Sequence, residues 1–261
     1  MNIFDCFTYN NEEMILDLRL SYLDRFFKKF IIVESKYTHQ GNLKKNFLNL
    51  NNFKKYQHKI DYNLIDKFPK NLSNWGRENY QRNFLANSIK NLHDDDYIMI
   101  SDLDEIPNLK NMNNIEKSKF TVFQQVNYSF KFNLKNITFP IWYGTKLCKK
   151  KYLKSPQWLR DQKIKKYSIL RFYKIKWNIV QNGGWHFSYI MSPNEISEKI
   201  KSFSHAEYNL EEYTNPKIIE EKINKGIDLF DRNQNYQKVE LDSSFPKFFF
   251  ENKTKFNKWI L

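Results

Sequence analysis

The chain has 261 residues, of which 41% are hydrophobic and 17% aromatic, enough to bury one substantial core. No apolar run reaches the roughly 18 residues of a membrane-spanning helix, which excludes a transmembrane helix. The two cysteines lie far apart, which excludes a disulfide scaffold. Together these features predict a soluble cytoplasmic protein. The formal net charge of +14 favours an anionic partner, namely a phosphorylated substrate, an anionic membrane surface or a nucleic acid, although the codon bias of an AT-rich genome would also enrich Lys.

The first hundred residues predict alternating strands and helices. A strand over Asn2–Phe7, an amphipathic helix over Glu12–Lys29 and a buried strand over Phe30–Glu34 form a β-α-β opening. This order implies a parallel sheet with a right-handed crossover. The elements expected next are a loop over Lys36–Asn46, a helix over Phe47–Tyr56, a strand over Lys59–Ile65, a helix over Trp75–Leu92 and a strand over Tyr97–Ile100.

The second half of the chain predicts aromatic-rich strands and then helices. The expected elements are strands over Phe120–Val126, Tyr128–Phe132 and Phe139–Thr145, a basic stretch over Lys149–Lys154, a strand over Ser168–Lys174, helices over Pro193–Phe203 and Pro216–Phe230, and an aromatic tail from Phe245. Because there is no internal repeat or linker, we predict one compact α/β domain, residues 1–261. Its first half, 1–107, is expected to bind a nucleotide and its second half, 108–261, to face an acceptor.

Asp102 and Asp104 directly follow the strand over Tyr97–Ile100. Ligands of open α/β sheets bind at the carboxyl ends of strands, so both carboxylates are expected to project into a crevice. Such a pair suits Mg²⁺ or Mn²⁺ bridged to substrate phosphates. The alternative is a solvated loop or helix cap before Pro107.

Further polar residues are expected at the same sheet edge. Glu34 ends a buried strand and either holds a nucleoside hydroxyl or accepts N–H bonds from a loop. On the helix over Trp75–Leu92, Glu78 and Arg82 are four residues apart and could form an ordinary ion pair. Alternatively, Arg77 or Arg82 approaches a diphosphate, to which a guanidinium can bind through two hydrogen bonds.

Two glycines precede an imidazole in Gly183-Gly184-Trp185-His186, and they would let the backbone approach a ligand closely. His186 is either a core residue or a third ligand of the metal. Farther along the chain, Glu207 is either a structural group at a helix end or a base.

Together these segments resemble glycosyltransferase family 17, and the similarity runs over most of the chain. It is carried by Asp5-Cys6-Phe7, Glu12, Leu18-Arg19-Leu20, Ile32-Val33-Glu34, Thr38, Gly41, Trp75, Arg77-Glu78, Arg82, Ser101 to Pro107, Gly183 to Ser188, Lys199, Phe203, His205 and Glu207. The resemblance implies a GT-A fold with a Rossmann-like mixed sheet flanked by helices. It also implies an inverting enzyme that uses UDP-N-acetylglucosamine and a divalent cation. By position, Asp102 would lie near the ribose and the metal, and Asp104 would bind the metal directly.

The resulting prediction is a metal-dependent glycosyltransferase with Mn²⁺ or Mg²⁺ as its cofactor and a glycan or glycolipid as acceptor. Arg77 or Arg82 would absorb charge on the departing nucleoside diphosphate, and a carboxylate would deprotonate the acceptor hydroxyl. Glu207 is the first candidate for this base and Asp161 the second. Peripheral contact with an anionic membrane is a further expectation.

Two other functions would account for parts of the sequence. The first is a nucleotidyltransferase or hydrolase on a similar sheet, which the lack of a Gly-rich phosphate loop disfavours. The second is a basic nucleic-acid-binding protein, suggested by the net charge and by aromatic residues interleaved with Lys. Six acids between Asp94 and Glu105 would repel phosphate groups, so no nucleic-acid partner is expected.

Overall fold

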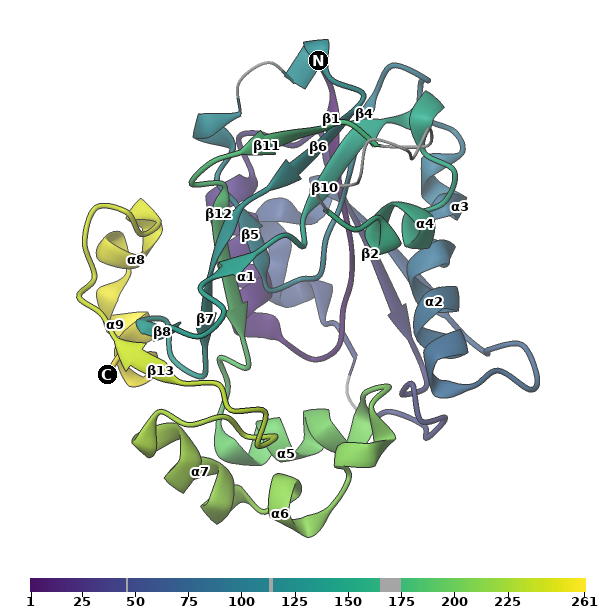
Figure 1. Cartoon of the computed structure of the whole chain (residues 1–261). Helices are drawn as coiled ribbons and strands as arrows, with labels where there is room; N and C mark the ends of the chain where they lie inside the picture. The colour runs from purple at the N-terminus through teal and green to yellow at the C-terminus, as the bar shows by residue number, and fades with distance from the viewer. Residues whose placement is uncertain (46, 113–114, 165–174) are drawn as a thin grey trace, which may run out of the picture.

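The computed structural model of the chain describes residues 1–45, 47–112, 115–164 and 175–261. In these ranges the strands form a seven-stranded and a six-stranded sheet, with helices around them (Figure 1). The strands are β1 (Ile3–Thr8), β2 (Lys29–Ser35), β3 (Ile60–Ile65), β4 (Tyr97–Ile100), β5 (Glu105–Pro107), β6 (Phe120–Phe123), β7 (Gln125–Ser129), β8 (Leu134–Asn136), β9 (Ile141–Trp142), β10 (Lys146–Lys149), β11 (Trp177–Val180), β12 (Gly184–Ser188) and β13 (Tyr236–Lys238). The α-helices are α1 (Glu13–Leu23), α2 (Asn74–Phe84), α3 (Ala86–Ile89), α4 (Pro156–Asp161), α5 (Pro193–Ser202), α6 (Glu211–Thr214), α7 (Pro216–Lys225), α8 (Lys247–Glu251) and α9 (Lys253–Phe256).

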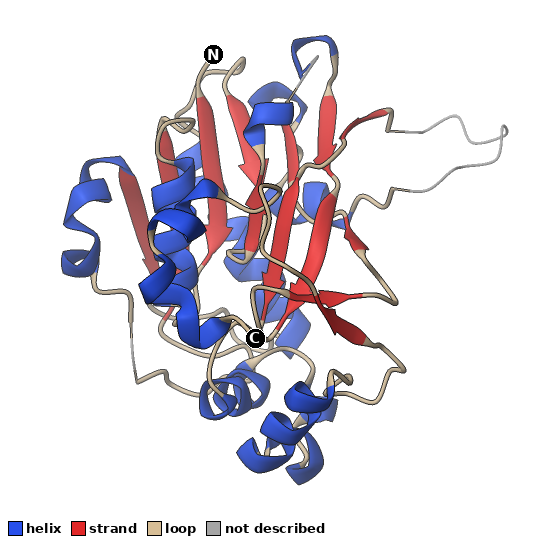
Figure 2. Cartoon of the chain, turned by 90° about the vertical axis from the view of Figure 1, so that its left-hand side faces the viewer, coloured by secondary structure: helices blue, strands red, loops and turns tan. Residues whose placement is uncertain are grey.

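The predicted β-α-β opening is confirmed. Strands β1, β2, β3 and β4 run parallel, and the order along the larger sheet is β11-β6-β10-β4-β1-β2-β3. The carboxyl ends of β1, β2 and β4 therefore share one edge of this sheet (Figure 2). That edge is where a ligand of an open α/β sheet is expected.

The larger sheet also takes strands from the second half of the chain. Strand β10 is antiparallel to β4 and β6, and β11 is parallel to β6, so the sheet is mixed. The smaller sheet has the order β13-β8-β7-β12-β5, with β9 beside β7. The mixed α/β class is thus confirmed, and both sheets combine segments that are far apart in sequence.

Several predicted helices are shorter or differ in type. The helix over Glu12–Lys29 ends at Leu23, because Lys29 already pairs with Phe4 in the sheet. The helix over Phe47–Tyr56 is a 3-10 helix, η1 (Leu50–Lys59). The helix over Trp75–Leu92 is divided into α2 and α3.

The strand predicted over Phe120–Val126 is wrong as a single element. It is divided at Gln124, so that β6 belongs to the larger sheet and β7 to the smaller one. The backbone N–H of Gln124 donates to the carbonyl of Val180, and its carbonyl accepts from the N–H of Gly183. Aromatic and β-branched residues, which favour strands, stand on both sides of this point, so the sequence does not reveal the change of sheet.

The two glycines before His186 serve strand packing. Gly184 has φ +122°, and a β-carbon there would lie 2.1 Å from the carbonyl oxygen of Ile106. Gly184 pairs with Pro107, so the backbone that approaches closely is that of β5. The interpretation that these glycines face a ligand is therefore wrong.

The later elements agree in part with the predictions. Strand β9 is the part of the predicted Phe139–Thr145 strand that forms, and the predicted Ser168–Lys174 strand lies outside the described residues. Helix α5 begins with a capping box between Ser192 and Glu195. Helix α7 ends at Lys225 rather than at Phe230, and Gly226 caps it in the left-handed conformation.

The core lies on both faces of the larger sheet. Along β1, Phe7 joins the apolar cluster that includes α1 and Phe249 of α8, whereas Cys6 joins the cluster that includes α3 and α4. This alternation follows the two-residue period of a strand. Cys6 and Cys148 are both buried free thiols. Across the described ranges, no helix is both long enough and apolar enough to cross a membrane.

Candidate active site

The segment after β4 is held by a buried arginine of α1. Arg19 is fully buried, and its Nε and Nη2 donate to Asp5 at 2.8 and 2.6 Å. Its Nη1 donates to the backbone carbonyls of Asp102, Leu103 and Glu105 at 3.1, 3.0 and 2.8 Å. This arginine therefore fixes the path of the backbone that carries both predicted aspartates.

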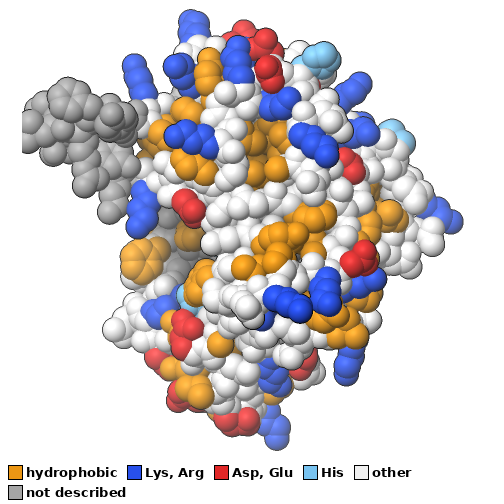
Figure 3. Space-filling model, turned by 90° about the vertical axis from the view of Figure 1, so that its right-hand side faces the viewer, with side chains coloured by type: hydrophobic (Ala, Val, Ile, Leu, Met, Phe, Trp, Pro, Cys, Tyr) orange, Lys and Arg blue, Asp and Glu red, His pale blue; other side chains and the backbone are white. Residues whose placement is uncertain are grey.

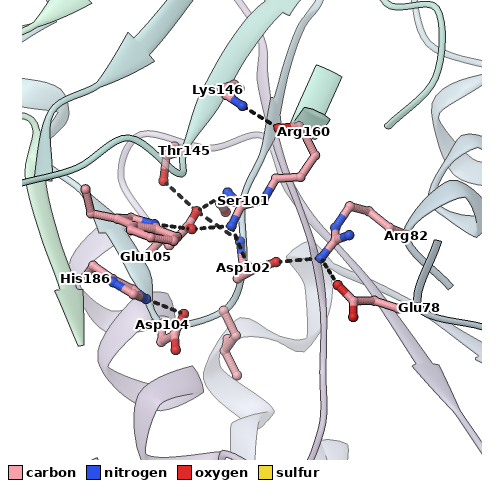
Figure 4. Close-up of polar contacts among 12 residues, drawn as sticks. Glu78, Arg82, Ser101, Asp102, Asp104, Glu105, Thr145, Lys146, Arg160 and His186 are labelled. Carbon is pink, nitrogen blue, oxygen red and sulfur yellow. Dashed lines mark hydrogen bonds and ion pairs between the residues drawn. The ribbon is translucent and has the colours of Figure 1, made fainter. Parts of the chain in front are cut away.

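Asp102 lies between two guanidinium groups (Figure 4). Its Oδ1 is 3.1 Å from Nη2 of Arg82, and its Oδ2 is 2.5 Å from Nη2 of Arg160. Although burial raises the pKa of Asp102, Arg160 and Arg82 together hold it well below its ordinary value. Asp102 is therefore a carboxylate that orients two arginines, and its side chain stays 35% exposed.

Glu105 fixes the second of these arginines. Its carboxylate is fully buried and accepts from Nη1 and Nη2 of Arg160 at 2.9 and 2.6 Å, and from Nε1 of Trp142 at 2.7 Å. It also accepts from the backbone N–H of Asp102 at 3.1 Å. The sequence alone does not reveal Arg160 or the role of Glu105, because an arginine on a short helix after a basic stretch carries no local signal.

A substitution at Gly144 tests this arrangement. A β-carbon at Gly144 would lie 1.8 Å from Oε1 of Glu105 and 2.3 Å from Nε1 of Trp142. We expect Gly144→Ala to displace the Glu105 carboxylate and to lower the free energy of unfolding by about 1–3 kcal/mol, the usual cost of overpacking. Urea unfolding measures this change.

Gly76 provides the matched control. A β-carbon there lies 3.3 Å from Oγ of Ser73 at the start of α2, so Gly76→Ala is expected to be tolerated. Equal stability of the Gly144→Ala and Gly76→Ala proteins would contradict the close packing around Glu105.

Asp104 faces His186 (Figure 4). Oδ1 of Asp104 lies 3.6 Å from Nε2 of His186, and each side chain is 12% exposed. On the far side of the ring, Nδ1 of His186 is 3.0 Å from Oδ1 of Asn127, whose Nδ2 donates to the carbonyl of Phe139. Because that amide is oriented by Phe139, its oxygen faces the ring and assigns the proton to Nδ1. The lone pair of Nε2 is therefore directed at Asp104.

Burial affects both groups strongly. It lowers the pKa of His186 to about 4, so the ring is neutral near pH 7. It also raises the pKa of Asp104 well above its ordinary value, an effect to which Glu12 and Asp102 add and which Lys199 opposes. Nζ of Lys199 is 2.7 Å from Oε1 of Glu12. Asp104 and Nε2 of His186 thus face each other in a nearly buried position, where the raised pKa favours a proton on the carboxyl group. A bound cation would replace that proton.

These two residues fit a divalent cation better than the predicted trio does. A carboxylate oxygen and an imidazole whose other nitrogen is fixed by an amide are donors that suit Mn²⁺. Both oxygens of Asp102, in contrast, are engaged by arginines. Within the described part of the chain, no group of three or more His, Cys, Asp or Glu is arranged to hold a metal ion. Metal binding by Asp102, Asp104 and His186 therefore stays a prediction.

A cavity of about 760 Å³ opens beside Asp102. Its wall includes Arg82, Arg160 and Lys146 together with Asp102 and Trp142. Burial, followed by the charge of Arg160, lowers the pKa of Lys146 to about 8. Nη1 of Arg82 also donates to Oε1 of Gln157 at 2.6 Å, so this guanidinium is held from both helices α2 and α4. The cavity therefore combines several cationic groups with the carboxylates of Glu78, Asp102 and Asp161.

The other predicted binding residues lie at varying distances from this cavity. Glu78 lines it and pairs with Arg82 at 3.2 Å. Arg77 instead donates to the carbonyl of His39 at 2.9 Å, which braces the loop after β2. The fully buried Glu34 accepts from the backbone N–H of Leu48, in line with the alternative of loop N–H bonds. It also accepts from Nζ of Lys44 and from Oη of Tyr62.

The two candidate bases differ in position. Asp161, at the end of α4, lines the cavity directly. Glu207 lies in a 3-10 turn, η5 (Ala206–Tyr208), with its side chain 61% exposed. Its Oε1 is 2.7 Å from Nδ1 of His205, and it is His205 that lines the cavity. The structure therefore does not bring Glu207 together with Asp102 and Asp104.

The predicted cluster of six acids is divided between the two ends of β4. Asp94 and Asp95 precede the strand, whereas Asp102 follows it. Nζ of Lys149 and of Lys151 lie 2.9 and 2.8 Å from Oδ1 of Asp95. The densest basic stretch is thus neutralised in part by acids at the end of β4 opposite the cavity.

On the face that carries α2, Lys and Arg side chains are spread among apolar and acidic ones and form no continuous basic patch (Figure 3). A nucleic-acid-binding groove would need such a patch. The view therefore lends the nucleic-acid interpretation no support on this face.

Comparisons with known proteins agree with the resemblance. A model of glycosyltransferase family 17 matches residues 1–241. Proteins named beta-1,4-mannosyl-glycoprotein 4-beta-N-acetylglucosaminyltransferase from Homo sapiens and Rattus norvegicus are each 30% identical over 115 residues, or 40% of this chain. The matched stretch covers 22% of the human protein and 21% of the rat protein, so the chain spans less than a quarter of these relatives.

Proposed function

This chain belongs to glycosyltransferase family 17, and we propose that it moves N-acetylglucosamine from UDP-N-acetylglucosamine to a hydroxyl group of a glycan or glycolipid, with inversion and with Mn²⁺ or Mg²⁺ as cofactor. The donor is supported by the names of the matching relatives. We further propose the GT-A fold, with residues 1–107 forming the nucleotide-sugar half and 108–261 the acceptor half. A cytoplasmic location and peripheral contact with an anionic membrane stay predictions.

The observation that carries the proposal is the arrangement around Asp102. The parallel strand β4 ends at a carboxylate that orients two guanidinium groups on the wall of a 760 Å³ cavity. Arginine binds phosphate through paired hydrogen bonds, and a diphosphate needs several such donors. In the described part of the chain, the buried Nε of Arg82 has no hydrogen-bond partner. An incoming phosphate oxygen would supply one after a small shift of the side chain.

The residues of the chain divide the chemistry between them. Negative charge develops on the leaving UDP when the bond to the anomeric carbon breaks, and Arg82, Arg160 and Lys146 are placed to stabilise it. Asp104 and His186 would hold the divalent cation, which would neutralise further charge on the diphosphate. Glu105 keeps Arg160 in position before the donor arrives. Such preorganised charge costs no rearrangement at the moment of reaction.

Thermal unfolding with nucleotide sugars tests the donor and the metal together. A ligand that binds the folded state alone raises the melting temperature. With UDP-N-acetylglucosamine at about 100-fold above its dissociation constant, we expect a rise of roughly 5–10 °C that requires Mn²⁺ and exceeds the rise with other donors.

The same panel tests the nucleic-acid-binding alternative and the need for a metal. A shift with single-stranded oligonucleotides, and none with any nucleotide sugar, would contradict the proposal and favour nucleic-acid binding. Equal shifts with and without Mn²⁺ would retain the transferase assignment but remove the metal.

The general base is tested by comparing the two candidate carboxylates. Asp161 lies on the cavity wall, whereas Glu207 reaches the cavity only through His205. We therefore expect Asp161→Asn to lower kcat at least about 100-fold, as for loss of a general base, and Glu207→Gln to lower it less than tenfold. The reverse order would restore Glu207 as the base.

A further inference from the structure

A second cavity, of about 350 Å³, adjoins the first and is walled by β7, β9, β12 and the segment before β13. Trp142 lines both cavities, and His186, which faces Asp104, lines the second. The two rings are stacked with centroids 4.7 Å apart and an angle of 17° between their planes. The two cavities therefore share a wall at Trp142, whose ring stacks on that of the proposed metal ligand His186.

We propose that this second cavity binds the acceptor as a pyranose sugar ring, with its C–H face against an aromatic side chain and its hydroxyl groups on the amides of the wall. The inference rests on the proposed glycosyltransferase function and adds to it a place and a chemical class for the acceptor. The volume lies at the lower end of the range of small-molecule pockets, about 300–1,000 Å³. That size suits a small sugar better than an extended peptide.

The aromatic walls supply the apolar part of such a site. Trp142 and Phe139 keep 38% and 56% of their surface exposed although both are large hydrophobic residues. Tyr189 and Tyr236 line the same cavity and combine an aromatic face with a hydroxyl group. Exposed aromatic side chains that line one concave surface are typical of a binding site.

The polar groups of the wall are fixed by the protein itself. Nδ2 of Asn136 donates to Oε1 of Gln234 at 2.7 Å, and Oδ1 of Asn136 accepts from the N–H of Phe139 at 2.7 Å. Arg232 is held by two hydrogen bonds from Nε and Nη2 to the buried Asp228, at 2.9 and 2.8 Å. Amides and a guanidinium of fixed orientation suit the ring hydroxyl groups of a sugar.

The backbone around the cavity is unusual as well. Phe130 and Tyr189, which both line it, have φ values of 69° and 56°. Bulky residues rarely adopt this left-handed conformation, and such positions cluster at ligand-binding sites. The conformation is held by the surrounding packing, so the aromatic walls are in place before a ligand enters.

Saturation-transfer NMR with methyl glycosides of N-acetylglucosamine, mannose, glucose and galactose tests the proposal. We expect ring protons of at least one glycoside to receive saturation from the wild-type protein. In Phe139→Ala and Gln234→Ala the signal should fall at least fivefold. The matched control is Phe250→Ala, an aromatic residue with 46% exposure that lines a different cavity, and it should retain the signal.

The melting-temperature shift with UDP-N-acetylglucosamine and Mn²⁺, measured on the same proteins, separates failure of the acceptor site from failure of the proposed function. A normal donor shift without saturation of any glycoside, or with a signal that survives both substitutions, overturns the acceptor site and leaves the proposed function intact. Loss of the signal in Phe139→Ala and Gln234→Ala without any donor shift in the wild type would support a sugar site and contradict the donor.

Discussion

Asp104→Asn is expected to lower glycosyl transfer about 1,000-fold and to remove the dependence of nucleotide binding on Mn²⁺. The carboxylate faces Nε2 of His186 at 3.6 Å, and with His186 it forms the pair that we propose as ligands of the cation. Loss of metal-assisted charge stabilisation removes several kcal/mol from the transition state, and each 1.36 kcal/mol corresponds to a factor of ten. Initial rates of transfer and melting temperatures with UDP-N-acetylglucosamine, each with and without Mn²⁺, measure the two effects.

The fold should survive this substitution. Asp104 is buried near Glu12 and Asp102, which raise its pKa, so a neutral side chain of the same shape relieves repulsion. The matched control is Asp95→Asn, at the opposite end of β4 with its side chain 70% exposed, which should leave transfer unchanged. Nucleotide binding by Asp104→Asn that still requires Mn²⁺ at the wild-type affinity would remove Asp104 from the metal site.

Arg19→Leu is expected to give the largest loss of stability, about 3–5 kcal/mol. The side chain is fully buried and pairs with the equally buried Asp5, so its removal leaves an uncompensated carboxylate in the core. The backbone carbonyls of Asp102, Leu103 and Glu105 lose their shared donor at the same time. Urea unfolding measures the change, which corresponds to a fall in melting temperature of roughly 10 °C.

Three further proteins complete this experiment: Arg25→Leu, Asp5→Leu and the double variant of Asp5 and Arg19. Arg25→Leu replaces an exposed arginine just after α1 and should change the stability by less than about 0.5 kcal/mol. In the double variant, Asp5→Leu with Arg19→Leu, both charges are absent, so the loss should be smaller than the sum of the single losses. Unchanged unfolding of Arg19→Leu would show that α1 does not anchor the segment after β4.

The identity and the order of the early elements could be predicted from the sequence, because a buried strand and a half-buried helix each produce a local pattern of apolar residues. The apolar run Tyr97–Ile100 forms β4 with the predicted bounds, and β2 lies within one residue of its prediction at each end. The end of β4 at the sheet edge also placed Asp102 near a cavity correctly. The pattern of motifs further sufficed to indicate the family, which the match over residues 1–241 confirms.

The partners of the site residues could not be read in the same way. Arg160 is 58 positions from Asp102 in the sequence and Arg19 is 83 positions from it, and no local sequence pattern indicates such a contact. Register and sheet membership also decide that Gly184 packs against β5 and that the segment over Phe120–Val126 divides between two sheets. Both register and sheet membership depend on which strand lies beside the segment, and the whole fold decides that.

The sequence by itself therefore determined the β-α-β opening, the family and the position of the aspartate pair, because these depend on residues close together along the chain. The tertiary structure alone decided that Asp102 orients two arginines while Asp104 faces His186. The carboxylates of Asp102 and Asp104 are only two positions apart but point to different neighbours, because Arg19 fixes the turn of the backbone between them. Their separate roles follow from contacts between α1, α2, α4 and β12, which come together in folding.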